Sequence, residues 1–377
     1  MTEIESSSPL FCGIQAYSAI GGIQRFDRHV VKALSEIQSD RGRQPPVVSF
    51  LRDASVPEPP RPDAEFLFFA GNRARFLWQS VTRAIRNAEI LIIDHINLLP
   101  LAAMVRIVRP RLPIVMFAHG VEVWDDPQFH RKRPYEPALV RFAVDRVAAV
   151  SAYTAEMMGT HYGIPRNRFV IFPCAVDPIA DTADRTDRRR PTVLTVTRLD
   201  ERERSKNIDK LIAAVAQLRT RCPELTCEIV GDGPLRAELE QLAGQLGVAD
   251  RVKFLGRATD AELAAAYQRA TVFALPSSKE GFGIVFLEAW LRRLPVICSS
   301  HGGAAYIVDN GVNGIAIDPE DPTALSTAIF WLVTNKQIAD QLANAGLLKT
   351  RTMFLHEHFR GRLRDLLREL LPRSSAA

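Results

Sequence analysis

The chain has 377 residues, 47% of them hydrophobic, which is enough for two ordinary globular domains with full cores. Its net charge of +5 is mild and its arginines occur in both halves, which favours an anionic small ligand or a membrane surface over sequence-specific nucleic-acid binding. The five cysteines are scattered and lack C-x-x-C spacing, which argues against a disulfide framework or a zinc site. The apolar stretch 90–105 is interrupted by polar residues, and residues 1–10 lack a secretory pattern, so a cytoplasmic location is expected.

In the first half of the chain, short apolar runs alternate with longer amphipathic segments, as in βα units around a parallel sheet. The apolar residues of 22–37 recur at helical spacing, and 72–86 has the pattern of a basic amphipathic helix. The runs predict strands at 10–16, 47–51, 65–69, 90–94, 114–118, 146–150 and 169–172.

The same alternation begins again at Pro191. It predicts strands at 192–197, 226–230, 252–255, 272–275, 296–298 and 314–317. Helices are predicted at 208–221, 235–246, 261–270 and 284–293, and a helical tail from Pro322 onward.

Two serial βα arrays predict an α/β fold of two Rossmann-like domains, with parallel sheets facing a deep interdomain cleft. The predicted limits are 1–174 for the first domain and 191–350 for the second. The polar, charged segment 175–190 is the expected linker, and the helical tail 351–377 is expected to pack back toward the first domain.

The most informative motif is Glu280-Gly281-Phe282-Gly283-Ile284-Val285, followed by Glu288. It comes after a predicted strand and opens a predicted helix, so the glycines allow close backbone approach and the helix amides offer an anion site. A carboxylate accepts hydrogen bonds from vicinal hydroxyls, which suits a sugar and a ribose. Taken alone, a carboxylate on a helix is structural more often than not, and Glu288 would then be a buried capping or salt-bridge residue.

These two glutamates, eight positions apart, resemble the donor-site signature of the retaining glycosyltransferase family four (glycosyltransferase group 1), whose fold is GT-B. The resemblance implies that Glu280 contacts the donor hexose and that Glu288 holds the nucleotide ribose. It also implies that backbone amides contact the sugar hydroxyls and the diphosphate, those of Gly281, Phe282, Gly283, Ile284 and Val285.

Arg198 and Lys206 resemble the cationic element of the same family, which implies that they neutralise the departing diphosphate without a metal ion. Two departures stand out. Thr197 replaces the usual glycine, and the insert 200–205 lengthens the spacing between the two cations. Arg204, inside that insert, is therefore an alternative candidate for the phosphate role.

The turn Gly231-Asp232-Gly233-Pro234 is a weak signal that is expected to be mainly structural. A G-x-G-x-x-G motif would need glycine where Arg236 stands, and this disfavours a Rossmann oxidoreductase.

In the first half, Gly22 follows a strand at a predicted helix start, and His119 follows the strand 114–118. Each has an ordinary structural explanation, as a tight βα turn and as a strand-end histidine. The resemblance implies that the Gly22 loop faces donor and acceptor and that His119 has a catalytic position near the transferred sugar. The basic segment 72–86 reads either as a membrane-docking helix or as a solvated helix over an ordinary core.

Two segments of the first domain, 18–22 (SAIGG) and 119–124 (HGVEVW), resemble bacterial polysaccharide mannosyltransferases, some of which use GDP-mannose. We therefore expect a retaining hexosyltransferase, with mannose among the candidate sugars and a GDP- or UDP-sugar as co-substrate. The expected acceptor is a glycan or a polyprenyl-diphosphate-linked glycan of bacterial surface polysaccharide or glycoconjugate synthesis, reached at the inner face of the plasma membrane. No metal, other cofactor or nucleic acid is expected. The alternative is an inactive nucleotide-sugar-binding module that serves as a partner or sensor.

Overall fold

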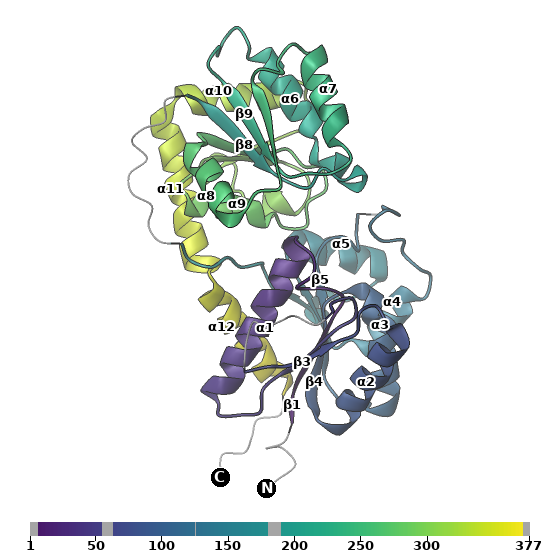
Figure 1. Cartoon of the computed structure of the whole chain (residues 1–377). Helices are drawn as coiled ribbons and strands as arrows, with labels where there is room; N and C mark the ends of the chain where they lie inside the picture. The colour runs from purple at the N-terminus through teal and green to yellow at the C-terminus, as the bar shows by residue number, and fades with distance from the viewer. Residues whose placement is uncertain (1–6, 55–62, 125, 180–189, 372–377) are drawn as a thin grey trace. The chain divides into compact units, whose positions relative to one another are not determined.

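The computed structural model describes residues 7–54, 63–124, 126–179 and 190–371. The chain divides into two compact units, each with its own parallel sheet (Figure 1). The first unit comprises Met1–Ala175 and His356–Ala377, and the second comprises Val176–Leu355. Of the predicted linker, residues 180–189 lie outside the described residues.

The first unit contains a seven-stranded sheet in the order β3-β2-β1-β4-β5-β6-β7. Its strand order reverses between β1 and β4. Strand β1 pairs in parallel with both β2 and β4, with Leu10 opposite Val47 of β2 and opposite Leu91 of β4. The strands are β1 (Ser8–Gly13), β2 (Val47–Phe50), β3 (Glu65–Phe68), β4 (Ala88–Ile93), β5 (Ile114–Ala118), β6 (Arg146–Ala149) and β7 (Phe169–Ile171). The helices are α1 (Gly22–Asp40), α2 (Arg73–Arg86), α3 (Leu99–Val108), α4 (Glu136–Ala143), α5 (Ala152–Tyr162) and α12 (His356–Leu370), with short 3-10 turns η2 (Ile96–Leu98) and η3 (Arg166–Arg168).

The C-terminal helix α12 completes the core of the first unit, where it lies along α1 (Figure 1). Phe359 of α12 meets Phe26 of α1 with ring centroids 5.2 Å apart, and Phe172 at 4.8 Å. Phe26 also meets Phe117 at 4.8 Å. These rings are fully buried, so edge-to-face packing adds to the apolar area that holds α12 on this unit.

The second unit contains a six-stranded sheet in the order β10-β9-β8-β11-β12-β13. The strands are β8 (Thr192–Val196), β9 (Thr226–Val230), β10 (Val252–Gly256), β11 (Val272–Leu275), β12 (Val296–Ser299) and β13 (Ile315–Ile317). The helices are α6 (Ile208–Gln217), α7 (Arg236–Gln245), α8 (Asp260–Arg269), α9 (Ile284–Leu291), α10 (Ala324–Thr334) and α11 (Lys336–Met353), with 3-10 turns η4 (Glu201–Lys206) and η5 (Gly303–Tyr306).

Both strand orders are those of a Rossmann-like doubly wound sheet, which confirms the predicted architecture of two such halves. Three helices of the first unit, α3, α4 and α5, were not among the predicted elements. The helix predicted at 208–221 is wrong at its end, because α6 stops at Gln217, ahead of the Cys222-Pro223 step where proline disfavours helical backbone. Among the described residues, no helix has the length and apolar character needed to cross a membrane.

Candidate functional site

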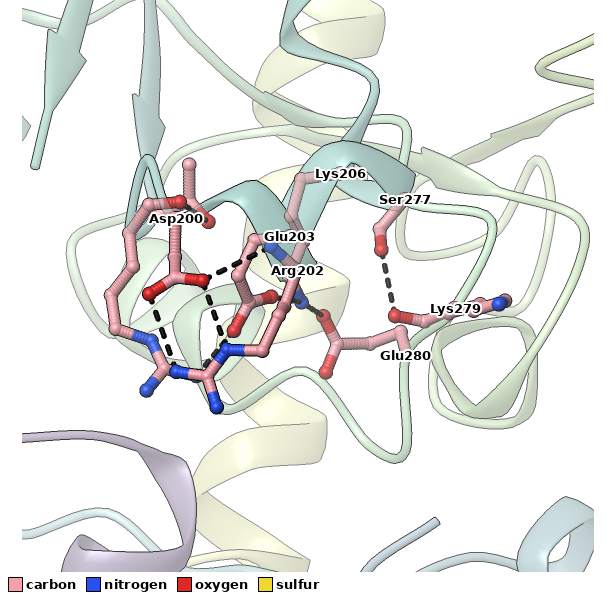
Figure 2. A network of polar contacts seen from close by, with 9 residues as sticks. Asp200, Arg202, Glu203, Lys206, Ser277, Lys279 and Glu280 are labelled. Carbon is pink, nitrogen blue, oxygen red and sulfur yellow. Dashed lines mark hydrogen bonds and ion pairs between the residues drawn. The ribbon is translucent and has the colours of Figure 1, made fainter. Parts of the chain in front are cut away.

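In the second unit, Lys206 and Glu280 come together at the carboxyl ends of neighbouring strands. Lys206 ends η4, which follows β8, and Glu280 lies in the loop after β11. The Lys206 Nζ atom donates to the Glu280 Oε2 atom at 2.8 Å, and the two side chains are only 13% and 14% exposed (Figure 2). The pairing brings together two residues that are 74 positions apart in the chain, both of which the motifs had singled out.

The Lys206 ammonium stays charged in this surrounding. Burial acts to lower its pKa, but the carboxylates of Glu280 and Glu203 outweigh that effect and raise the pKa above its ordinary value. A cation that is largely shielded from solvent interacts more strongly with an incoming anion than the same cation would in water, because the effective dielectric constant is lower.

Arg198, which follows β8, is held by a carboxylate inside the insert. Its Nη2 atom donates to the Glu203 Oε1 atom, and the other carboxylate oxygen of Glu203 lies 3.8 Å from Lys206 Nζ. Arg198 is 60% exposed, so its guanidinium can still meet a ligand. The structure therefore brings three of the predicted residues, Arg198, Lys206 and Glu280, into one row of charges.

The alternative cation Arg204 is engaged elsewhere. Its two terminal nitrogens each donate at 2.7 Å to the carboxylate of Glu238 on α7, and its Nε atom donates to Glu201 at 3.0 Å. A planar guanidinium fixed bidentately on one carboxylate has little capacity left for a phosphate. The geometry favours Lys206 over Arg204.

Asn207 fixes Lys206 relative to the Glu280 loop. Its side-chain amide donates to the Pro276 carbonyl at 2.7 Å and to the Ser278 hydroxyl at 2.8 Å. The backbone of Ser278 also donates to Ser205 at 2.8 Å. Asn207 has a left-handed backbone with φ of 56°, which asparagine tolerates better than most residues. The Lys-Asn pair was visible in the sequence, but the anchoring role of its amide was not.

The loop Gly281-Phe282-Gly283 leads directly into α9. Gly283 has φ of 89° and caps the helix, so a side chain there would be strained. Phe282 is buried against Phe354, so its backbone is the part that remains available to a ligand. Ile284 and Val285 form the first helical turn, whose amides lack acceptors inside the helix and can bind an anion.

A second loop, not singled out from the sequence, supports this one. After β12, the Gly303 amide donates to the Glu280 carbonyl at 2.6 Å. A Cβ atom on Gly303 would lie 1.9 Å from the Gly281 carbonyl oxygen. The sequence signal was the Gly302-Gly303 pair in the loop after the predicted strand 296–298.

Glu288 lies on α9 with its side chain buried. The Tyr267 hydroxyl donates to its Oε2 atom at 3.1 Å. This contact holds one carboxylate oxygen in place and is compatible with both interpretations made from the sequence, a ribose contact and a structural carboxylate. The ribose role stays a prediction.

In the first unit, the loop before Gly22 is held by two buried carboxylates. Asp53 accepts from the backbone of Ala16 at 2.7 Å and of Ser18 at 2.9 Å, and Asp94 accepts from Ile14 at 2.8 Å. Burial raises the pKa of Asp94 to about 7. Gly22 begins α1, and a Cβ atom on it would meet no described atom within 4 Å. The Gly22 loop is thus built on two buried aspartates, and Asp53 was not singled out from the sequence.

His119 follows β5 and is buried against Phe26, with ring centroids 4.9 Å apart. Its Nε2 atom lies 2.8 Å from the Asp94 carbonyl oxygen, and because that oxygen can only accept, Nε2 carries the proton. Burial lowers the pKa of His119 to about 4, so the ring is neutral at pH 7 and its Nδ1 atom is an acceptor. A neutral acceptor suits a sugar hydroxyl.

Two family models match consecutive parts of the chain. The model described as glycosyltransferase family 4 matches residues 20–179, and the model described as glycosyl transferases group 1 matches residues 180–348. The chain belongs to glycosyltransferase family 4. The predicted family is thereby confirmed.

Curated relatives are similar to this family 4 chain over part of their length. A GDP-mannose-dependent alpha-(1-6)-phosphatidylinositol monomannoside mannosyltransferase of Mycolicibacterium smegmatis is 35% identical, over 62% of this chain and 64% of its own. A D-inositol 3-phosphate glycosyltransferase of Salinispora tropica is 31% identical, over 59% of this chain and 52% of its own. The match therefore spans less than two thirds of these relatives.

Solved structures resemble the family 4 chain over nearly its full length. Anabaena HepE, solved in complex with UDP and glucose, has a TM-score of 0.76 at 20% identity and covers 96% of this chain and 99% of its own. A glycosyltransferase from Rickettsia africae has a TM-score of 0.79 at 15% identity, with 98% and 100% covered. At this identity the likeness establishes the fold, and the GT-B prediction is confirmed.

Proposed function

We propose that this family 4 chain transfers a hexose from a nucleoside-diphosphate sugar to a glycan or lipid-linked acceptor, with retention of anomeric configuration. The observation that carries the proposal is the charge row of Arg198, Lys206 and Glu280 beside the start of α9. Cations and helix amides fixed at one place can stabilise the negative charge that develops on a departing diphosphate.

Each member of the site receives one role in this proposal. Arg198 and Lys206 meet the diphosphate, and the first-turn amides of α9 bind the sugar hydroxyls and phosphate oxygens. Glu280 orients the hexose through its hydroxyls, and Glu288 orients the ribose. Because two cations already face the leaving group, the proposed reaction requires no divalent metal.

Lys206 changes partner in the course of this reaction. Its ammonium lies 2.8 Å from the Glu280 carboxylate. When a diphosphate arrives, the same ammonium can attract it, and the Glu280 carboxylate can accept from sugar hydroxyls. The ion pair therefore keeps both groups ordered for the donor.

The acceptor is assigned to the first unit, where the Gly22 loop and His119 lie at the carboxyl ends of β1 and β5. Ligands of doubly wound sheets bind at those ends. The neutral His119 accepts a hydroxyl hydrogen at Nδ1, since Nε2 is committed to the Asp94 carbonyl.

A set of purified-protein assays tests the proposal. UDP-glucose and GDP-mannose are each incubated with the protein and a bacterial membrane-lipid extract, in EDTA, and nucleoside diphosphate release and sugar transfer into lipid are measured. The proposal predicts transfer with at least one donor, and the anomeric configuration of the product by NMR shows retention. Binding without transfer would favour an inactive nucleotide-sugar-binding module, and a requirement for added divalent metal would contradict the cationic leaving-group account.

We also propose that the first unit contacts an anionic bilayer at the inner face of the plasma membrane. Helices α2 and α3 pack together, as do α3 and α4. Neither α2 nor α3 contains an acidic residue, and exposed arginines adjoin exposed apolar side chains. The exposed apolar residues along these helices are Trp78, Ile85, Met104, Ile107, Val108 and Phe142. Apolar side chains beside cations are the combination that binds anionic lipid surfaces.

Vesicle sedimentation tests this contact. Binding to phosphatidylglycerol vesicles, weak binding to phosphatidylcholine vesicles, and loss of binding in a Trp78→Ala/Ile107→Ser variant are expected. Phe76 is fully buried, so it belongs to the core and offers no membrane contact. Equal sedimentation with both lipids, or with neither, would refute the proposal.

A further inference from the structure

One carboxylate of the insert, Glu203, faces the opposite way from its neighbours. Glu201, Arg202 and Arg204 are more than half exposed, at 56%, 54% and 53% of their side chains. Glu203 is 7% exposed and contacts both Arg198 and Lys206. Figure 2 shows its side chain beside that of Lys206. The residues that lengthen the spacing between the two cations thus form a 3-10 turn, and this turn buries the side chain of Glu203.

The carboxylate of Glu203 contacts both cations of the site. One oxygen accepts from Arg198 Nη2, and the other lies 3.8 Å from Lys206 Nζ. Arg198 is 60% exposed and would otherwise have the rotamer freedom of a surface arginine. Ordering such a side chain in advance removes an entropic cost from the step in which it must meet a phosphate.

We propose that Glu203 is a positioning residue, which holds Arg198 and Lys206 in the geometry needed for the departing diphosphate. It touches neither sugar nor phosphate in this scheme and acts through the two cations. The inference rests on the proposed function, because it assigns Glu203 a part in the same donor site. It also explains why an acidic residue lies between two residues whose proposed task is to attract an anion.

Together with Glu203, the charge row has no net charge, because the cations of Arg198 and Lys206 are balanced by the carboxylates of Glu203 and Glu280. Removal of Glu203 therefore leaves a net positive site. Nucleoside diphosphate binds such a site at least as tightly as before, whereas turnover falls because Arg198 is no longer held. This split between product affinity and kcat distinguishes positioning from a loss of folding, which would weaken both.

A double-mutant cycle tests the proposal on the full chain. The variants are Arg198→Ala, Glu203→Ala and the double variant, and the readouts are kcat, KM and the Kd of UDP and GDP by calorimetry. Each single substitution is expected to lower kcat by roughly ten- to a hundredfold, the size of one charge-assisted hydrogen bond. The double variant is expected to be little worse than Arg198→Ala, because the hydrogen bond of Glu203 is made to that arginine and its 3.8 Å pair with Lys206 is the weaker of the two contacts.

Glu201→Ala is the matched control, since Glu201 lies on the same turn, is 56% exposed and pairs with Arg204. It is expected to keep wild-type kcat. Glu203→Gln retains an oxygen that accepts from Arg198, so it is expected to recover part of the activity lost in Glu203→Ala. Should Glu203→Ala fail to fold by circular dichroism, the cycle is run with Glu203→Gln.

Additive losses in the double variant would overturn the positioning role, as would wild-type kcat in both Glu203 variants. Weaker binding of UDP and GDP to well-folded Glu203→Ala would also overturn it. Failure of the proposed function has a different signature, because the wild-type protein itself would then neither transfer sugar nor bind a nucleoside diphosphate.

Discussion

Substitution of Lys206 by alanine is expected to abolish most turnover while the protein stays folded. The Lys206 ammonium is 13% exposed and has its nearest carboxylate at 2.8 Å. Two unit charges about 4 Å apart interact by roughly 4 kcal/mol at an effective dielectric constant of 20, which is the scale of its attraction to each negative charge of a diphosphate. The loss of one preorganised group of this kind lowers kcat by about 100- to 1000-fold.

The same substitution leaves the Glu280 carboxylate without the ammonium that pairs with it. Breaking a fully buried pair costs about 3–5 kcal/mol, and the partial exposure here reduces the expected loss to about 2 kcal/mol. For a unit of this size, that corresponds to a fall in Tm of roughly 4–8 °C.

The assay compares initial rates of nucleoside diphosphate release and thermal unfolding for wild type, Lys206→Ala and Lys210→Ala. Lys210 is the control, because it makes a similar 2.7 Å pair with Glu320 on an exposed surface of the same unit. Lys210→Ala is expected to keep its rate and to lose at most about 1 kcal/mol. Wild-type turnover in Lys206→Ala would refute the reasoning and would return the phosphate role to Arg204.

Three further outcomes follow from other contacts. Gly303→Ala is expected to lower donor affinity and kcat, because its Cβ atom would lie 1.9 Å from the Gly281 carbonyl oxygen; unchanged donor KM and kcat would contradict this. Asn207→Asp replaces the amide that donates to Pro276 and Ser278, so a loss of about 1–3 kcal/mol in the free energy of unfolding is expected from denaturant titration, and no loss would contradict the anchoring role. His119 is neutral in the fold because burial lowers its pKa to about 4, so the unfolded chain takes up its proton first as the pH falls from about 6.5. The wild type should therefore lose about 2–3 kcal/mol relative to His119→Gln between pH 7.5 and pH 4.5, and parallel stability curves would show that His119 does not titrate this way.

The sheet architecture was readable from the sequence because buried parallel strands are short apolar runs bounded by turn residues. The strands at 114–118, 226–230 and 272–275 have the predicted limits. Helices α3, α4 and α5 were missed. In α3 the residues are apolar nearly all round, so 99–108 merges with the preceding strand. Helix α4 is only eight residues long, and α5 carries weak periodicity.

In the second unit, the site residues that belong to a sequence motif could be predicted. Contacts between residues far apart in the sequence could not. Glu280 and Lys206 were named from their own motifs, and the structure brings them within hydrogen-bonding distance. The sequence shows that the insert lengthens the spacing between Arg198 and Lys206. Only the structure shows that the side chain of Glu203 is buried and that of Arg204 is exposed. The support that Gly303 gives to the Glu280 loop depends on two strands being neighbours, which no local pattern records.

The central claim is that fixed cations, and not a metal ion, receive the departing diphosphate. The most direct measurement is the rate of sugar transfer from UDP-glucose or GDP-mannose into a membrane-lipid extract in EDTA, compared between wild type and Lys206→Ala. The account predicts transfer by the wild type in EDTA at the rate seen with added magnesium, and a loss of about 100-fold or more in the variant. Transfer that stops in EDTA and returns with magnesium, at equal rates in both proteins, would contradict it.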